Sequence, residues 1–244
     1  MDYVCLAAGK GTRFGELGRY LQKCMYPVGL RPFVELSVAN LLESHYTDLD
    51  ADTLTFIVGH HAEQLEHYFG NSYQGLPVTY LHQTEQLGTG HALHLFSQKR
   101  QVEQPVVAWL ADAYVTTERF ERVQAHAEVN VQTVAPGPAD EKPDLKVTTD
   151  GDLITKAWRG TEPMYDCGLW KLSPAVLALM TTRRDGEYRM VPNLQLALER
   201  GHRVGVIRAE EWLHLGGVHP TPEENVLSVV ERVLELERSV ERTA

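Results

Sequence analysis

The sequence has few cysteines, no long hydrophobic run and fewer basic than acidic residues. Its three cysteines, Cys5, Cys24 and Cys167, are far apart and form no CxxC pair, which argues against a disulfide framework or a zinc knuckle and favours a reducing compartment. No apolar run approaches the roughly 18 residues that a membrane span needs. The chain also opens on an apolar stretch without the basic segment of a signal peptide. We therefore expect a cytoplasmic protein with no membrane partner.

The charge balance excludes one class of partner. The 23 Lys and Arg residues against 33 Asp and Glu give a formal net charge of −10. A protein that binds nucleic acid non-specifically needs clustered Lys and Arg, so we expect no nucleic-acid partner. A nucleotide site stays open, because a local basic loop and Mg²⁺ can neutralise phosphates. With 244 residues and 43% hydrophobic content, the chain can bury a core without disulfides or a structural metal.

The first half of the chain alternates short apolar runs with amphipathic stretches. The apolar runs predict strands at 3–7, 53–58, 78–81 and 106–110. Helices are expected at 32–46, at 62–69 and from about residue 88. Strands separated by helices form βαβ units, so we expect a mostly parallel sheet with right-handed crossovers.

The second half is predicted to be more antiparallel and to continue the same domain. Strands are expected at 129–135, 145–149, 153–158, 164–172 and 203–208, and helices at 174–181, at 189–200 and from about 221. Asp150-Gly151-Asp152 between two β runs indicates a hairpin. We expect one mixed α/β domain over residues 1–244. The apolar face of the last helix packs on that domain or, alternatively, forms a homo-oligomer.

A Gly-rich segment follows the first strand: Leu6-Ala7-Ala8-Gly9-Lys10-Gly11-Thr12-Arg13-Phe14-Gly15. Its spacing fits neither the Walker A loop nor the dinucleotide fingerprint. It still suits phosphates, since glycines let backbone N–H groups approach an anion and Lys10, Thr12 and Arg13 add donors. The alternative is a βα turn whose basic residues are solvated.

Five further segments extend this signal along nearly the whole chain. They are Lys23 to Glu35, His82 to Ala92, Trp109 to Asp112, Tyr165 to Trp170 and Trp212 to Gly216. Together with the Gly-rich segment they resemble the sugar-phosphate nucleotidylyltransferases, whose consensus begins LAAGxGTR, carries a Lys about ten residues later and continues PVxxxPxxE. The nucleotide-binding motifs are most similar to those of N-acetylglucosamine-1-phosphate uridylyltransferases and glucose-1-phosphate thymidylyltransferases.

The resemblance implies a fold and a reaction. The fold is a Rossmann-like, glycosyltransferase-A type α/β domain with a mixed sheet flanked by helices, here without an appended acyltransferase or β-helix domain. The reaction joins a sugar-1-phosphate to the α-phosphorus of a nucleoside triphosphate (NTP), in an in-line displacement that releases pyrophosphate. The attacking phosphate is already an anion, so positioning and charge neutralisation replace a general base.

The resemblance also assigns roles. Arg13 holds the leaving pyrophosphate, Lys23 bridges the α-phosphate and the attacking phosphate, and Asp112 holds Mg²⁺. The nucleotide-binding residues it implies are Leu6, Ala7, Ala8, Gly9, Lys10, Gly11, Thr12, Gln83, Gly88 and Thr89. The acceptor-binding residues it implies are Trp158, Asp166, Gly168 and Glu187. The Gln83 amide matches a uracil or thymine edge, which favours UTP, then dTTP, with CTP third.

Three positions depart from the hexosamine pattern. Trp158-Arg159 replaces a Glu, Asp166 an Asn and His214 an Asp. The phosphorylated small-molecule acceptor is therefore an unusual sugar phosphate or, alternatively, a non-sugar phosphate or phosphonate such as phosphocholine, used with CTP. A catalytically silent nucleotide-binding regulator is the third reading.

The late segment also bears on the metal. Either His214 or His219 takes the second metal position beside Asp112, or neither does. An imidazole ligand would favour Mn²⁺ or Co²⁺ over Mg²⁺. His60-His61 and the pair His91/His94 have no ligand partners at metal-site spacing, so we expect no metal there.

Overall fold

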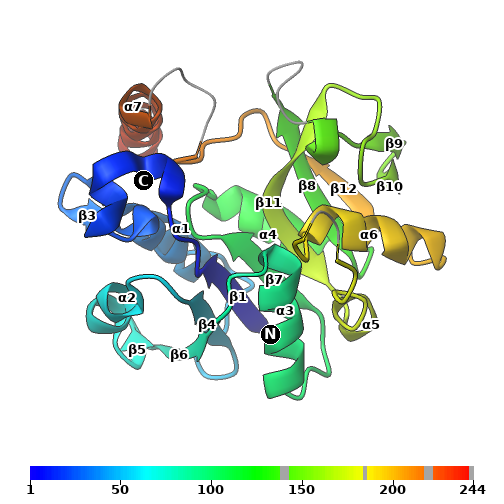
Figure 1. The fold of residues 1–244 in the computed structure, drawn as a ribbon, viewed down its shortest axis with the longest axis horizontal. Coiled ribbons are helices and arrows are strands. Elements are labelled where there is room, and N and C mark those ends of the chain that lie inside the picture. Colours follow the sequence, from blue (N-terminus) through cyan, green and yellow to red (C-terminus); the bar gives the residue numbers. More distant parts are fainter. Residues whose placement is uncertain (138–142, 184–185, 217–221, 242–244) are drawn as a thin grey trace.

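The computed structural model describes residues 1–137, 143–183, 186–216 and 222–241, and a ten-stranded sheet runs through the centre of these segments (Figure 1). The strand order is β5-β6-β4-β1-β7-β11-β8-β12-β10-β9. The strands of this sheet are β1 (Asp2–Ala7), β4 (Thr53–Val58), β5 (Ser72–Tyr73), β6 (Leu76–His82), β7 (Val106–Leu110), β8 (Val131–Pro136), β9 (Thr148–Asp150), β10 (Leu153–Lys156), β11 (Met164–Leu172) and β12 (Gly205–Arg208). A separate ribbon pairs β2 (Pro27–Val28) with β3 (Arg31–Pro32).

The sheet changes direction where the sequence predicted it. Strands β6, β4, β1 and β7 are parallel, and Cys5 pairs with Phe56 on one side and Trp109 on the other. Strand β11 then runs antiparallel to both β7 and β8. The predicted hairpin at Gly151 joins β9 to β10. The expected glycosyltransferase-A type α/β architecture is thus confirmed, with β8 and β12 as one further parallel pair.

Helices cover both faces of the sheet (Figure 1). One face carries α1 (Phe33–Leu42), α2 (Ala62–Phe69) and α4 (Thr117–Ala125), and the other carries α3 (Thr89–Lys99), α5 (Pro174–Leu177) and α6 (Met190–Glu199). Strand β1 explains how one short run serves two cores. Tyr3 and Cys5 pack on the first side and Val4 and Leu6 on the second, because side chains alternate across a strand. A strand buried on both faces therefore has a continuous apolar sequence.

The last helix, α7 (Pro222–Glu241), packs beside the sheet and not on it. Val226, Val229 and Val233 are buried against Phe14, which lies in the 3-10 helix η1 (Thr12–Arg19), and against Leu215. This helix therefore braces the end of the Gly-rich segment and the late segment at once. In the part of the chain that the structure describes, neither α7 nor any other helix has the length and apolarity needed to cross a membrane.

A few boundaries differ from the predictions. The strand expected at 145–149 begins only at Thr148, because residues 143–145 form the 3-10 helix η3 (Pro143–Leu145). The helix expected at 174–181 ends at Leu177, after which the chain tightens and Leu179 N–H donates to Val176 O. Four elements were not predicted from the sequence: α4, β5, η1 and the one-turn η2 (Lys23–Met25).

Candidate active site

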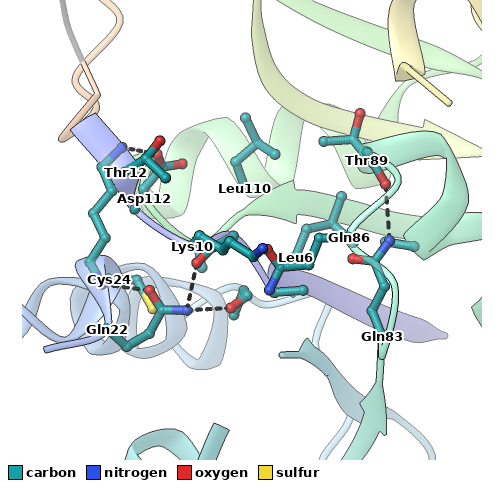
Figure 2. Close-up of a pocket in the computed structure, with 18 of the residues that line it drawn as sticks. Leu6, Lys10, Thr12, Gln22, Cys24, Gln83, Gln86, Thr89, Leu110 and Asp112 are labelled. Atoms are coloured by element: carbon teal, nitrogen blue, oxygen red, sulfur yellow. Dashed lines mark hydrogen bonds and ion pairs between the residues drawn. The ribbon is translucent and has the colours of Figure 1, made fainter. Parts of the chain in front are cut away.

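A pocket of about 430 Å³ opens where β1 and β7 end, and the loops that follow these strands and β6 line it. Open α/β sheets bind ligands at the carboxyl ends of their strands. The lining residues are Leu6, Ala7, Ala8, Gly9, Lys10, Gly11, Thr12, Gln22, Lys23, Cys24, Gln83, Gln86, Gly88, Thr89, Ala92, Leu110, Ala111, Asp112 and Glu187. Figure 2 shows Thr12 and Asp112 at one end and Gln83 and Thr89 at the other. The pocket thus gathers all ten predicted nucleotide-binding residues and two of the three predicted catalytic ones.

Gln22, the residue before Lys23, binds the Gly-rich segment through its side chain. Its buried amide Nε2 donates to the backbone oxygens of Ala7 at 2.6 Å, Gly9 at 3.3 Å and His60 at 3.1 Å. Its Oε1 accepts from the backbone N–H of Lys23. One side chain therefore ties both ends of the loop together (Figure 2). Gln22 belongs to no motif and was not predicted from the sequence.

Three side chains at the start of α2 bind the backbone of residues 18–20, which lie between the Gly-rich segment and Lys23. We call these side chains the α2 clamp: His60, His61 and Gln64. His60 Nε2 donates to Gly18 O at 2.9 Å and His61 Nε2 to Arg19 O at 3.1 Å. Gln64 Nε2 donates to the next carbonyl along, that of Tyr20, at 2.8 Å, and its Oε1 accepts from Gln22 N at 2.8 Å. The two histidines thus bind backbone carbonyls, and no cluster of three metal-ligating side chains occurs within the described segments.

Lys23 and Asp112 form an ion pair inside the pocket. Lys23 Nζ lies 2.5 Å from Asp112 Oδ2, with the side chains 14% and 29% exposed. Burial raises the pKa of Asp112, but the charges of Lys23 and His214 outweigh it and bring the pKa to about 2. The carboxylate is therefore ionised at neutral pH. Removing either partner would leave a poorly solvated charge.

The late segment, residues 212–216, is held directly beside Asp112. Ala113 and His214 form an antiparallel bridge, and the Leu215 N–H donates to Asp112 O at 2.9 Å. A Cβ placed on Gly216 would lie 2.5 Å from Lys23 Nζ, 3.4 Å from His214 Nδ1 and 3.6 Å from Asp112 Oδ2. A side chain at position 216 would therefore displace the tip of Lys23 from its place beside Asp112.

The donor set beside Gly216 fits a hard cation in part. An ionised Asp112 is a suitable ligand for Mg²⁺, which is commonly held by one or two carboxylates plus substrate phosphates. His214 Nδ1 faces the same space but accepts the Gly216 N–H at 3.2 Å, so a metal ion would have to displace that hydrogen bond. His219, the other proposed ligand, lies outside the described residues. The side chain of Arg13 is likewise not described.

At the far end of the pocket, His91 orients Gln83. The Gln83 Nε2 donates to Gly88 O at 3.2 Å and to His91 Nδ1 at 2.7 Å. Burial lowers the pKa of His91, and a charge on His94 would lower it further, so the ring is neutral and can accept. Both amide hydrogens are thereby used within the protein, which presents the Gln83 oxygen to a ligand.

The turn after Gln83 is braced by residues 187–190. Gly90 N–H donates to Tyr188 O at 2.7 Å, and Tyr188 N–H donates to Leu87 O at 2.6 Å. Gly88 has a φ of +104°, and a Cβ there would lie 2.6 Å from Tyr188 O, so no other residue fits. Met190 N–H donates to Thr89 Oγ1 at 3.0 Å. This brace brings Glu187 to the rim of the pocket.

The other three predicted acceptor residues do not line this pocket. Asp166 is buried in β11, where Trp170 Nε1 donates to its Oδ1 at 2.7 Å and burial raises its pKa to about 7. Gly168 presses its backbone on Leu110, since a Cβ would lie 2.6 Å from Leu110 Cδ1. Trp158 stacks under the Arg159 guanidinium at 4.5 Å. Their acceptor roles stay predictions.

Fold and pocket together define an α/β protein with a Gly-rich pocket at the carboxyl ends of parallel strands. Residues 3–146, more than half of the chain, match the protein family described as "Nucleotidyl transferase". The chain therefore belongs to this family, and the prediction of a nucleotidyltransferase enzyme is confirmed.

Curated relatives point to sugar-phosphate chemistry. The UTP–glucose-1-phosphate uridylyltransferase AglF of Haloferax volcanii is 28% identical over 225 residues, covering 87% of this chain and 89% of that protein. The bifunctional protein GlmU of Pseudoalteromonas atlantica is 24% identical over 98% of this chain. The chain spans only about half (52%) of that longer relative.

Solved structures share the fold. A UDP-glucose pyrophosphorylase complexed with UDP-glucose has a TM-score of 0.76 at 15% identity, covering 96% of this chain and 98% of that one. A structure from Bacillus anthracis that is described as a glucose-1-phosphate thymidylyltransferase has a TM-score of 0.74 at 19% identity. The match covers 94% of this chain and 95% of that one.

Proposed function

We propose that this chain transfers a nucleoside monophosphate from UTP or dTTP to a sugar-1-phosphate and releases pyrophosphate. The observation that carries the proposal is that the Gly-rich segment, the Gln83–Thr89 turn, Lys23 and Asp112 line the same pocket. These groups come from three loops far apart in sequence. The similarity to AglF, whose name specifies UTP and glucose 1-phosphate, supports the same substrate class.

In this reaction, an oxygen of the acceptor phosphate forms a bond to the α-phosphorus, and the bond from that phosphorus to the bridging oxygen of the β-phosphate breaks. The electron pair leaves with pyrophosphate, and no proton needs to be removed from the nucleophile. The backbone N–H groups of residues 9–12 and Arg13 would hold the leaving group. Lys23 would neutralise the crowded oxygens around the α-phosphorus.

The base is recognised at the Gln83 end. Because both Gln83 amide hydrogens are engaged by Gly88 and His91, its oxygen is the acceptor for a ligand, which matches the N3–H of uracil or thymine. A purine would have to displace the turn that Tyr188 braces. This favours UTP and dTTP over ATP and GTP.

We propose Mg²⁺ as the cofactor, with Asp112 as its protein ligand and His214 or His219 as the second. A bound Mg²⁺ supplies charge neutralisation at the phosphate oxygens. Glu187, at the rim beside the base turn, would contact the acceptor. We also propose that residues 1–244 act as one domain, since β1 and β12 belong to the same sheet.

The proposal is tested by identifying the product. The purified chain is incubated with Mg²⁺, glucose 1-phosphate and each of UTP, dTTP and CTP, and mass spectrometry is used to detect the nucleotide-sugar. A parallel reaction contains CTP and phosphocholine. A UDP- or dTDP-sugar is expected. CDP-choline as the only product would support the cytidylyltransferase reading, and no product in any reaction would support the silent regulator.

A further inference from the structure

We propose that Lys23 is a latch on the metal site: without nucleotide, its ammonium group occupies the Asp112 carboxylate, and a divalent cation binds Asp112 only when phosphate has drawn Lys23 away. This inference rests on the proposed function, because it assumes a nucleotide in this pocket. The latch adds an order of binding to the proposed function, since the protein would take up the metal ion together with the nucleotide and not before it.

The latch is visible in the contact itself. Nζ lies 2.5 Å from Oδ2, so the ammonium group occupies a carboxylate oxygen that a divalent cation would otherwise coordinate, and the Lys23 side chain is only 14% exposed. Lys23 reaches this position through the space that Gly216 leaves, where any Cβ would meet Nζ at 2.5 Å. The lack of a side chain at residue 216 thus leaves the ammonium group room beside Asp112. A cation placed on Asp112 beside it would face a like charge at contact distance.

The backbone under Lys23 is fixed, so that release involves the side chain. Gln22 binds the Lys23 N–H and the Gly-rich segment, and Gln64 binds Gln22 in turn. The flexible four-carbon stem of lysine can swing without moving this frame. Lys10 and the backbone of residues 9–12 line the same pocket, which places a bound triphosphate within its mouth. Its several negative charges would compete with the single charge of Asp112 for the ammonium.

Apart from Asp112, the described residues offer few ligands for a divalent cation. Across the described residues, no group of three His, Cys, Asp or Glu side chains could hold a metal ion. The His214 Nδ1 next to Asp112 is engaged by the Gly216 N–H. Phosphate oxygens, which commonly complete the coordination of a cation held by one or two carboxylates, are the same groups that attract Lys23. Because coupling between two ligands is reciprocal, metal should strengthen nucleotide binding by the same factor.

The test measures Mn²⁺ binding without nucleotide, by electron paramagnetic resonance of the free ion, so it needs no activity. Four forms are compared: the wild-type chain, Lys23→Met, Lys23→Met with Asp112→Asn, and Lys99→Gln. The last removes an exposed lysine of α3 that does not line the pocket, and so controls for overall charge. Circular dichroism verifies that each form is folded.

We expect Lys23→Met to bind one Mn²⁺ at least about tenfold more tightly than the wild-type chain and Lys99→Gln, and the added Asp112→Asn to abolish that gain. Equal affinity of wild type and Lys23→Met would overturn the latch. So would a gain that survives Asp112→Asn, because the gained site would then lie elsewhere. A thermal shift of the wild-type chain with UTP tests nucleotide binding separately, so failure of the latch and failure of the proposed function are distinguishable.

Discussion

His91 Nδ1 accepts a hydrogen bond from Gln83 Nε2 at 2.7 Å, and together with the Gly88 carbonyl it leaves the Gln83 amide oxygen as the atom available to a ligand. We expect His91→Leu to raise the KM for UTP about tenfold, since a buried amide that loses its partner is free to rotate. His94→Leu is the matched control, because it removes a histidine one helical turn further along α3. Steady-state kinetics with UTP and CTP measure both. Unchanged KM and base preference in His91→Leu would contradict this orienting role.

Lys23 and Arg13 carry the charge neutralisation in the proposed reaction. Lys23→Ala and Arg13→Ala should each lower turnover by about 10²-fold or more, as expected for loss of one preorganised charged donor. Lys99→Ala should leave turnover unchanged. Pyrophosphate release at saturating substrates is the measurement. Near-normal turnover in both variants would rule out the phosphate assignment.

The α2 clamp predicts that a residue outside the pocket lining matters for catalysis. His60→Leu removes the donor to Gly18 O and should lower kcat/KM for the nucleotide about tenfold, because small displacements of positioning groups are costly. His60→Gln places an amide donor at similar reach and should restore most of the loss. His67→Gln, on the exposed side of α2, is the control.

Hydrogen–deuterium exchange measures the effect of the clamp on the loop itself, separately from its effect on catalysis. Hydrogen–deuterium exchange over residues 18–23 should rise in His60→Leu and return toward wild type in His60→Gln. If exchange and kcat/KM in His60→Leu both stay at the wild-type values, the α2 clamp does not position the loop that carries Lys23.

The raised pKa of Asp166 predicts that the stability of the chain depends on pH. Burial raises its pKa to about 7, so the folded protein retains a proton that the unfolded chain has released at lower pH. The stability of the wild-type chain should therefore fall as pH rises from about 4 to 7 and then level off. Asp166→Asn keeps an oxygen that can accept from Trp170 and carries no charge.

We expect Asp166→Asn to be more stable than the wild type at pH 8, by about 1 kcal/mol or more, with the difference shrinking toward pH 4. Chemical denaturation at the two pH values measures it. The exposed Asp150→Asn serves as the control. A pH-independent difference would contradict the buried-acid account.

The metal preference follows from the late segment. If His214 joins Asp112 in holding the cation, wild-type activity should favour Mn²⁺ or Co²⁺ over Mg²⁺, and His214→Asp should shift the preference back to Mg²⁺. Activity titrations with the three ions compare wild type, His214→Asp and His219→Asp. A preference that neither substitution changes would exclude both histidines while leaving Asp112 as the ligand.

Much of this architecture could be predicted from local pattern. Helix α2 begins at Ala62 and ends at Phe69 as expected, and the Gly151 hairpin forms, because apolar periodicity and turn residues are local signals. The Gly-rich segment, Lys23 and Asp112 were found because they belong to motifs. Their convergence in one pocket follows from the parallel sheet, which brings the ends of β1 and β7 to one edge.

What could not be predicted depends on contacts between distant segments. Gln22, His60 and Gln64 act through backbone carbonyls some 15 to 45 residues away, and such bonds leave no spacing pattern in the sequence. Asp166 is buried in β11 with Gln132 and Trp170 as its donors, and Gly168 packs on Leu110, which are likewise tertiary contacts. His61 has a left-handed φ of 52° at the start of α2, which no local signal indicated.

The most direct test of the account is the base preference of pyrophosphate release. Initial rates are measured with glucose 1-phosphate and Mg²⁺ for UTP, dTTP, CTP, ATP and GTP, with Asp112→Asn as the blank. We predict kcat/KM for UTP or dTTP to exceed that for ATP and GTP by about 10²-fold or more, as a pocket with engaged polar groups discriminates strongly. A purine nucleotide used as well as UTP, or release from no nucleotide above the blank, would contradict it.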